Sequence, residues 1–378
     1  MIFLLVFALI ILTQIVFSIS FFTTDSIYLQ GFGALQLSAF IVSIIVLFLN
    51  FRRKQTTDYR KAFNAFGFMI ASGVPALPFL VFGIIYFITG IEAVKYIGWG
   101  MSFLLFLGIL SGILFGRWNW KIHPIKLSFP HLPEAMNGLK IIQISDIHIG
   151  SFFNKHHKVQ KAIDLINAQK PDYVLFTGDL VNNIAAEVVG WEPVFQGIKA
   201  KKGKYSILGN HDYGDYVPWE SKDDKHTNLN RLVQKHRDLG FTPLLNDAIE
   251  MAEGLWLLGV ENWGRAPFRQ SGKLLETLEK VPHTAMKILM SHDPTHFDLE
   301  IRETNVDLTL SGHTHGMQFG IDRWGLRWSP VKYYYKRWAG LYQEEDQYLY
   351  VNRGFGYLGF PGRVGIYPEI TVFELTKS

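Results

Sequence analysis

The chain has 378 residues, more than twice the size of a typical domain of about 150, so at least two structural units are expected. Hydrophobic residues make up 48% and charged residues 19%, which excludes a disordered or collagen-like protein. The net charge of +4 does not by itself predict a polyanion-binding surface. The absence of cysteine excludes disulfides, thiolate metal sites and a cysteine nucleophile, which leaves oxygen and nitrogen groups for any chemistry.

The apolar excess is concentrated in the first 117 residues. A membrane-spanning helix needs about 20 apolar residues. Four stretches satisfy this length and predict four spans, at residues 2–22, 31–50, 62–89 and 97–115. Gly73, Pro75 and Pro78 predict a kink in the third stretch. A cleaved signal peptide and buried soluble helices are alternatives, but no basic residues precede the first stretch and three more apolar stretches follow it.

The basic residues of the short loops predict the orientation in the membrane. The loop between the second and third stretches contains five of them, Arg52, Arg53, Lys54, Arg60 and Lys61. Because Lys and Arg mark cytoplasmic loops, this loop is predicted to be cytoplasmic. Counting crossings then places the chain after Arg117 on the same side, as expected for a multi-pass protein of a bacterial inner membrane with a cytoplasmic catalytic domain. One extra or one missing span would reverse this orientation.

The rest of the chain predicts a linker and a soluble domain. Residues 1–117 form the predicted transmembrane region, residues 118–137 with their three prolines the linker, and residues 138–378 the domain. In this domain, apolar β-rich runs alternate with helical patterns, which indicates an α/β fold. Strands are predicted at residues 139–145, 172–177, 204–208, 241–245, 255–260, 286–290 and 306–310, and helices at 155–170, 228–239 and 272–278.

Polar side chains follow five of these predicted strands at the point where each strand ends. They are Asp146 and His148; Gly178 and Asp179; Asn210, His211 and Asp212; His292; and His313 and His315. Ligands of open α/β sheets bind at the carboxyl ends of the strands, so these side chains are predicted to meet at one rim.

The residue types and spacings at this rim indicate a metal site. In an extended chain the period of two points both side chains of a D-x-H or H-x-H pair the same way. A carboxylate such as Asp179 can bridge two cations, and carboxylate, imidazole and amide ligands together suit Mn, Fe, Zn or Co. A single such motif is weak, since roughly nine in ten matches are caps or turns. Five motifs in order predict a two-metal hydrolytic centre.

The ordered set D-x-H, G-D, G-N-H-D, H and G-H-x-H, over about residues 138–375, resembles the calcineurin-like metallophosphoesterases. The resemblance implies a four-layered α/β/β/α sandwich with two divalent metal ions. It implies that the first metal is held by Asp146, His148, Asp179 and His315, and the second by Asp179, Asn210, His292 and His313. It further implies that His211 approaches the phosphoryl or leaving-group oxygen and that Asp212 orients His211.

The implied activity is hydrolysis of a phosphodiester or pyrophosphate bond by a metal-activated hydroxide. Within the superfamily, the four N-terminal stretches, the segment VNRGFG at residues 351–356 and PEI at residues 368–370 resemble the membrane-associated phosphodiesterases. That branch includes enzymes that hydrolyse UDP-2,3-diacylglucosamine. Alternative hypotheses are an enzyme acting on a soluble cyclic nucleotide or phosphoprotein, and a non-catalytic membrane scaffold. The scaffold would predict an incomplete ligand set.

Residues 323–342 alternate basic and aromatic side chains, which suits a bilayer interface and favours a lipid-linked phosphorylated substrate. Stacking on nucleotide bases and a solvent-covered loop are the alternatives. Arg353 and Arg363 are candidates for gripping a substrate phosphate, or for anchoring loops to carboxylates. Nucleic acid is not expected as a partner, and no residue pattern predicts an oligomeric state.

Overall fold

A computed structural model describes residues 2–20, 27–51 and 57–378. The chain divides into a helical unit and an α/β unit. The helical unit contains the N-terminal helices and the short segment Gly359–Val364, and the α/β unit contains Arg117–Leu358 and Gly365–Ser378.

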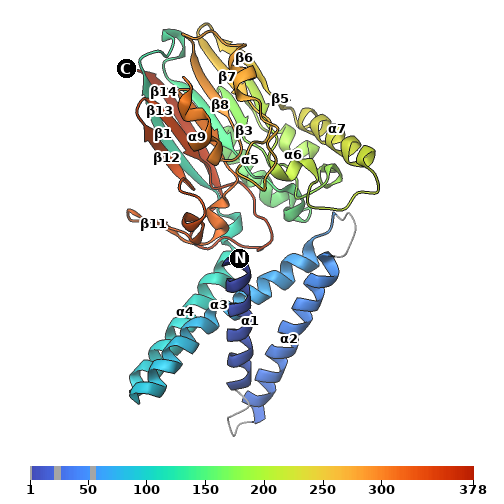
Figure 1. The fold of residues 1–378 in the computed structure, drawn as a ribbon, viewed down its shortest axis with the longest axis vertical. Helices are drawn as coiled ribbons and strands as arrows, with labels where there is room; N and C mark the ends of the chain where they lie inside the picture. Colours follow the sequence, from blue (N-terminus) through green and yellow to red (C-terminus); the bar gives the residue numbers. More distant parts are fainter. Residues whose placement is uncertain (1, 21–26, 52–56) are drawn as a thin grey trace. The chain divides into compact units, whose positions relative to one another are not determined.

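The helices of the helical unit coincide with the four apolar stretches (Figure 1). They are α1 (Ile2–Ser20), α2 (Ile27–Phe51), α3 (Arg60–Thr89) and α4 (Glu92–Leu114). Among the described residues, two helical segments are long and apolar enough to cross a membrane: α3, and α4 with its short extension to Trp118. The third stretch forms one helix that contains Pro75 and Pro78. Three basic residues of the predicted cytoplasmic loop, Arg52, Arg53 and Lys54, lie outside the described residues.

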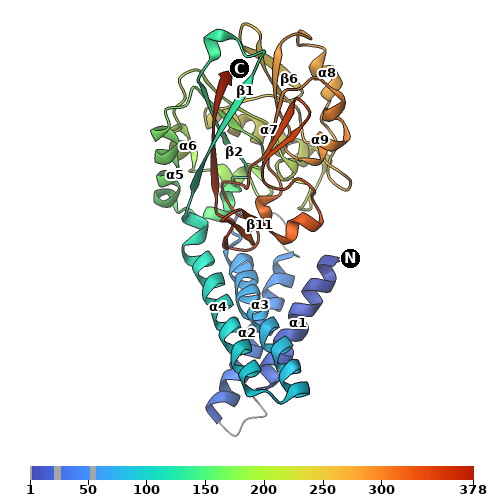
Figure 2. The same cartoon turned by 90° about the vertical axis from the view of Figure 1, so that its left-hand side faces the viewer.

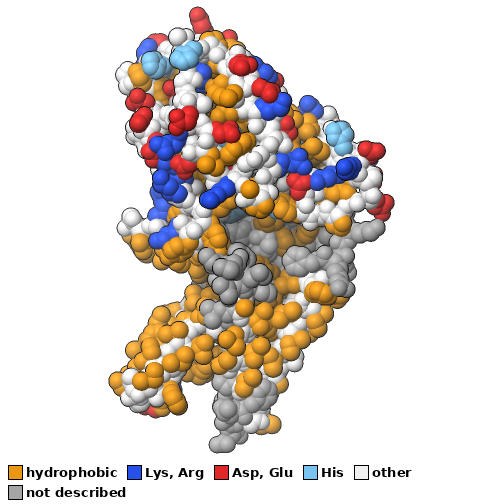
Figure 3. Space-filling view, in the orientation of Figure 1, with side chains coloured by type: hydrophobic (Ala, Val, Ile, Leu, Met, Phe, Trp, Pro, Cys, Tyr) orange, Lys and Arg blue, Asp and Glu red, His pale blue; other side chains and the backbone are white. Residues whose placement is uncertain are grey.

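Many exposed side chains of α3 and α4 are apolar, and hydrophobic side chains cover much of the helical part seen in Figure 3. Phe87 is 89% exposed, Ile88 76% and Leu104 69%. Apolar side chains in such number on helix surfaces mark a membrane or protein contact rather than a surface that faces water. The exposed side chains therefore agree with membrane association.

A loop segment from near the C-terminus clusters with these helices, so the predicted contiguous domain of residues 138–378 differs from the observed units. The backbone N–H of Arg363 donates to the carbonyl oxygen of Gly112 at 3.1 Å. A Cβ atom on Gly67 would lie 2.7 Å from Cγ of Pro361, so glycine permits the close approach of this loop to α3. The sequence of this segment has no periodicity that would predict the packing.

The α/β unit contains two six-stranded sheets. The strands of the first sheet, in spatial order, are β1 (Lys121–Phe129), β14 (Glu369–Lys377), β2 (Leu139–Ile144), β3 (Tyr173–Phe176), β4 (Gly203–Ser206) and β5 (Thr242–Pro243). Those of the second sheet are β12 (Gly340–Glu344), β13 (Gln347–Val351), β9 (Leu308–Ser311), β8 (Met286–Met290), β7 (Leu255–Gly259) and β6 (Asp247–Ala252). A separate hairpin joins β10 (Ile321–Arg323) and β11 (Leu326–Trp328).

The segment predicted as a linker contains the strand β1, which differs from the expectation. β1 pairs in parallel with β14 along its whole length and forms the edge of the first sheet. Pro124 lies in β1, which an edge strand tolerates because one row of its N–H groups is not needed for pairing. The prolines therefore indicated an edge position and not an unstructured connection.

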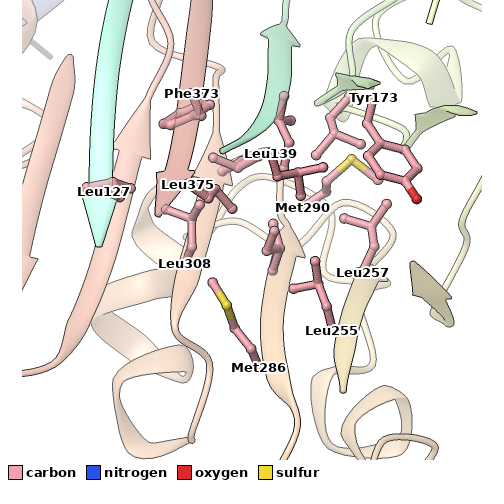
Figure 4. Packing of buried hydrophobic residues seen from close by; sticks show 14 of the residues in the cluster. Leu127, Leu139, Tyr173, Leu255, Leu257, Met286, Met290, Leu308, Phe373 and Leu375 are labelled. Atoms are coloured by element: carbon pink, nitrogen blue, oxygen red, sulfur yellow. The ribbon is translucent and has the colours of Figure 1, made fainter. Parts of the chain in front are cut away.

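The two sheets face one another across a shared apolar core (Figure 4). Leu139 and Phe373 of the first sheet and Leu257, Met290 and Leu308 of the second belong to this core. The helices of this unit are α5 (His156–Ala168), α6 (Glu192–Gln196), α7 (Lys222–Asp238), α8 (Leu274–Leu278) and α9 (Thr295–Leu299). In Figure 2, α5 and α6 lie on one side of the sheets, and α8 and α9 lie on the other. The expected α/β/β/α sandwich is confirmed.

Parallel pairing brings the ends of the motif-bearing strands together. β2, β3 and β4 are parallel neighbours in the first sheet, and β7, β8 and β9 in the second. The loops after β2, β3, β4, β8 and β9 carry the polar motifs.

Candidate metal centre

The loops at the ends of these strands bring the predicted ligands into two groups. The first consists of Asp146, His148 and His315, and the second of Asp179, His292 and His313. In each group one potential ligand atom per residue lies within 4.8 Å of the others. Four separate parts of the chain thus contribute to these two groups.

The first group has close contacts between its potential ligand atoms. His315 Nε2 lies 3.3 Å from Asp146 Oδ1, and His148 Nε2 lies 3.0 Å from His315 Nε2. Two ring nitrogens so close together must share a proton or face a common cation. A divalent ion between them would satisfy both lone pairs.

The second group includes an amide oxygen and is joined to the first by Asp179. His292 Nε2 lies 3.2 Å from Asp179 Oδ2, and Asn210 Oδ1 lies 2.7 Å from His313 Nδ1. Asp179 Oδ2 also lies 3.5 Å from His148 Nε2 of the first group. This carboxylate is therefore placed to bridge two cations.

Two of the imidazoles are oriented by backbone carbonyls. His148 Nδ1 donates to the oxygen of Val181 at 3.1 Å, and His292 Nδ1 donates to the oxygen of Thr177 at 2.7 Å. Each Nε2 then presents its lone pair to the site, as a metal-ligating histidine requires. His292 Nε2 is buried and makes no hydrogen bond to any described residue. This buried ring nitrogen beside the Asp179 carboxylate, together with the mixed oxygen and nitrogen donors, fits a divalent metal.

The backbone of the site is strained. Five of the seven candidate ligands have positive φ angles, namely Asp146, His148, Asp179, His313 and His315. Such backbone conformations cost of order 1 kcal/mol or more each in residues other than glycine. The surrounding packing must maintain them, and strain concentrated in this way is typical of a functional site.

Gly178 and Gly312 allow the chain segments to approach one another. A Cβ atom on Gly178 would lie 2.5 Å from the backbone N of Gly209, and Gly178 also has a φ of 94°. A Cβ atom on Gly312 would lie 1.9 Å from Ser145 Oγ and 2.3 Å from Asp146 Oδ2. A side chain at either position would displace a ligand or the loop that supports it.

Burial and mutual charge govern the ionisation of these groups. Burial and the neighbouring Asp179 raise the pKa of Asp146 to about 6, and burial lowers the pKa of His148 to about 3, so its imidazole is neutral at pH 7. Burial disfavours the charged form of His292, but the Asp179 carboxylate outweighs this and raises the pKa of His292 to about 10. Without a metal, the proton on His292 supplies the positive charge that a cation would otherwise supply beside Asp179.

His211 and Asp212 differ in their contacts from the expected arrangement, in which Asp212 orients His211. The ring Nδ1 of His211 hydrogen-bonds to the carbonyl oxygen of Asn182 at 2.7 Å, and that carbonyl is what orients the ring. The Asp212 carboxylate accepts from four backbone N–H groups, those of Asp179, Leu180, Val181 and Gly209. Asp212 thus holds the loops that carry Asp179 and Asn210 together.

Residues outside the predicted set contact His313. Its Nε2 lies 2.7 Å from the Tyr335 hydroxyl and 3.5 Å from Asp293 Oδ2. The ring of Phe268 packs against it edge to face, with 4.7 Å between ring centroids. Asp293 follows the predicted ligand His292 directly, and Tyr335 lies in the basic and aromatic segment. Neither position was assigned a role at the site from the sequence.

Arg353 and Arg363 lie in different environments from the seven ligands. The guanidinium of Arg353 is buried and paired with Glu369 and Asp322. This favours the second of its expected roles, which is to anchor a loop to carboxylates. Arg363 is fully buried in the segment that clusters with the helices. Neither environment supports the binding of a substrate phosphate by these two side chains.

Comparison with known proteins agrees with this geometry. Residues 139–317 match the family described as calcineurin-like phosphoesterase. A Bacillus subtilis protein named uncharacterized metallophosphoesterase YkuE is 31% identical over 68% of this chain and 85% of its own length. A Danio rerio protein named transmembrane protein with metallophosphoesterase domain is 28% identical over 68% of this chain and 58% of its own length. A Campylobacter jejuni metallophosphoesterase is 30% identical over 65% of this chain and 61% of its own length.

Proposed function

Because the chain belongs to the calcineurin-like phosphoesterase family and is therefore a metal-dependent phosphoester hydrolase, we propose that it hydrolyses a phosphodiester or pyrophosphate bond at a dinuclear centre. The observation that carries the proposal is the pair of ligand groups joined by Asp179. The complete ligand set argues against a non-catalytic scaffold.

The two metals would be held by the residues named above, with Asp179 between them. When bound, such a metal pair neutralises phosphoryl charge and lowers the pKa of water. His211 has its Nδ1 committed to Asn182, so its Nε2 is the atom that can donate a proton to the departing oxygen when the ring is protonated. Tyr216 extends this edge of the site, because its hydroxyl accepts from Asn210 Nδ2 at 2.7 Å and its ring lies 4.5 Å from that of His211.

Mn²⁺-stimulated hydrolysis of bis(p-nitrophenyl) phosphate by the purified full-length protein tests the proposal. Asp179→Ala and His313→Ala are expected to lower kcat by at least about a hundredfold, because each removes a metal ligand. Asp164→Ala and His226→Ala are matched controls on exposed positions and should retain wild-type rates. Unchanged hydrolysis in the Asp179 variant would refute the proposal. Faster hydrolysis of p-nitrophenyl phosphate than of the diester would favour a phosphomonoesterase.

We propose further that the substrate is lipid-linked. The hairpin of β10 and β11 presents apolar side chains beside basic ones: Trp324 is 93% exposed and Leu326 55%, next to Arg323. Aromatic rings at head-group level with cations near lipid phosphates are typical of an interfacial surface. The apolar helices support membrane association, which would keep the site near lipids.

Comparison of a phosphodiester lipid in liposomes with its soluble short-chain analogue tests this second proposal. The wild-type protein is expected to prefer the liposomal substrate, and Trp324→Ala should lose this preference. Leu275→Ala is the control, because Leu275 is 71% exposed on α8, away from the hairpin in the chain. Equal rates on both substrates would favour a soluble substrate such as a cyclic nucleotide or a phosphoprotein.

A cytoplasmic location of the α/β unit, on the inner membrane of a bacterium, is the third part of the proposal. It rests on the basic residues between the second and third apolar stretches. Because the chain has no cysteine, the single substitution Lys377→Cys gives one reactive thiol at an exposed position. Labelling of intact cells by a membrane-impermeant maleimide is expected only after permeabilisation. Labelling without permeabilisation would place the unit outside.

A further inference from the structure

A cavity of about 330 Å³ lies beside the candidate metal centre. One wall is the loop after β7, which includes Arg265, and the other is the segment Tyr334–Arg337. Two contacts connect these walls with the site: Phe268, from the same loop as Arg265, packs against His313, and Tyr335 approaches His313 Nε2 at 2.7 Å. Tyr335 therefore both lines the cavity and contacts a candidate metal ligand.

The floor of the cavity is also tied to the site. Thr295, at the start of α9, binds Asp293 Oδ1 through both its backbone N–H and its hydroxyl, at 2.8 and 2.7 Å. The backbone N–H of Arg265 donates to the same Thr295 hydroxyl at 3.0 Å. Asp293 Oδ2 is buried, makes no hydrogen bond to any described residue and lies 3.5 Å from His313 Nε2. The backbone of Arg265 is thus linked through Thr295 to Asp293, whose other carboxylate oxygen faces His313 Nε2.

The charges around the cavity do not balance. Beside the cavity, Arg337 and Arg302 each form ion pairs with both Asp298 and Glu344. Two acidic and two basic side chains neutralise one another in this cluster. The cavity is lined by two further cations, Arg265 and Lys336, and both are exposed. Neither makes an ion pair within 4 Å with a described residue, and Lys336 acts on Glu344 only at longer range, so both cations can still contact a ligand.

We infer that this cavity binds a second anionic group of the substrate, such as another phosphoryl group next to the one that is cleaved. The inference rests on the proposed function and narrows it to substrates with more than one anionic group. Arg265 and Lys336 would contact the second group through charge-assisted hydrogen bonds, while the ring of Tyr335 separates it from His313. A diester with a single phosphoryl group would leave the cavity without an anion.

Steady-state kinetics of the full-length protein with Mn²⁺ test the inference on two substrates. Bis(p-nitrophenyl) phosphate has one phosphoryl group, and bis(p-nitrophenyl) pyrophosphate has two. Arg265→Gln and Lys336→Gln are each expected to raise KM for the pyrophosphate about tenfold, the loss of one charge-assisted contact. KM for the monophosphate diester and kcat for both substrates should change less than about twofold. Lys332→Gln, which changes an exposed lysine two residues before Tyr334, is the control.

Each possible outcome either supports or overturns the inference that the cavity binds a second anionic group. An equal rise of KM for both substrates, or no rise for either, would overturn the inference while leaving the proposed function intact. Activation of diester hydrolysis by added inorganic phosphate would assign the cavity to a separate anion and would also overturn it. If the wild-type protein hydrolyses neither substrate with Mn²⁺, the proposed function fails and the inference fails with it.

Discussion

Both ring nitrogens of His313 have close side-chain partners. Nδ1 faces Asn210 Oδ1 at 2.7 Å, and Nε2 faces the Tyr335 hydroxyl at 2.7 Å. If Nδ1 is the ligand atom, Nε2 carries the ring proton and donates it to Tyr335 or to Asp293. Such an outer partner fixes the tautomer and the ring orientation, and its loss commonly weakens metal binding 10- to 100-fold.

Tyr335→Phe is therefore expected to weaken the binding of one of two metal equivalents by about tenfold, because it removes the hydroxyl and keeps the ring. Calorimetric titration of Mn²⁺ into the metal-free protein measures this change. Tyr334→Phe is the control, since Tyr334 is the neighbouring tyrosine and is 45% exposed. Two unchanged dissociation constants in the Tyr335 variant would show that Asp293 alone orients the ring.

The difference between the predicted and unpredicted site residues has a physical origin. Asp146, Asn210 and His315 could be named from the sequence because each lies in a short motif directly after an apolar strand, and strand ends converge in α/β sheets. Tyr335 lies in an irregular segment whose apolar residues have neither helical nor strand periodicity. Its place at the site therefore depends on tertiary folding. The contact of His211 with Asn182 was not predicted either, since a backbone carbonyl can orient a ring whatever the residue type.

Buried polar groups join strand β14 of the first sheet to strand β13 of the second. Glu369 of β14 in the first sheet accepts from the Tyr350 hydroxyl of β13 in the second sheet at 2.6 Å, and from Arg353 just after β13 at 2.6 Å. Burial alone would raise the pKa of Glu369, but the guanidinium of Arg353 lowers it to about 2 from an ordinary 4.5. This cluster joins the two sheets beside the loop that Arg353 anchors.

The lowered pKa of Glu369 predicts a defined pH dependence of stability. The ionised carboxylate of Glu369 stabilises the fold above about pH 4.5, and this contribution is lost as the pH falls from about 4.5 towards 2, because the folded state takes up its proton at a lower pKa than the unfolded state. Glu369→Gln should lower the free energy of unfolding by about 3 kcal/mol or more at pH 7, since it leaves Arg353 without its main partner.

Chemical denaturation at pH 7 and at pH 3.5 measures this dependence. The difference between wild type and Glu369→Gln is expected to shrink at the lower pH. The control Glu374→Gln changes a more exposed glutamate on the same strand, paired only with Lys126 at the surface, and should cost less than about 1 kcal/mol. A difference that is the same at both pH values would contradict the assigned ion pair.

Local patterns identified some elements better than others. The buried parallel strands β2, β3, β7, β8 and β9 were predicted because they are short apolar runs bounded by turn residues. The strand β1 was missed because Pro124 and Pro130 resemble a linker, and its partner β14 lies at the other end of the sequence. The strands β12 and β13 carry several polar residues, so alternation alone did not distinguish them from a loop.

At the scale of the whole molecule, hydropathy separates the helical region from the rest, but only tertiary contacts show that Gly359–Val364 belongs with the helices. The candidate metal ligands all lie in the α/β unit. Without cations, buried carboxylates and imidazoles of the site must satisfy one another, and strained backbone holds five of them in place. A ligand that binds only the folded site stabilises it in proportion to the logarithm of its concentration.

Added Mn²⁺ at about 100 times its dissociation constant should therefore stabilise the α/β unit by about 2.7 kcal/mol for each occupied site and raise its midpoint of unfolding by several degrees. Tryptophan fluorescence reports on this unit, because all tryptophans except Trp99 follow Arg117. Chelation by EDTA should reverse the rise, and Asp179→Ala should abolish most of it, since Asp179 contacts both ligand groups. Asp164→Ala should respond as the wild type does. An equal rise in the Asp179 variant would mean that Mn²⁺ binds elsewhere, and the dinuclear centre would then lose its support.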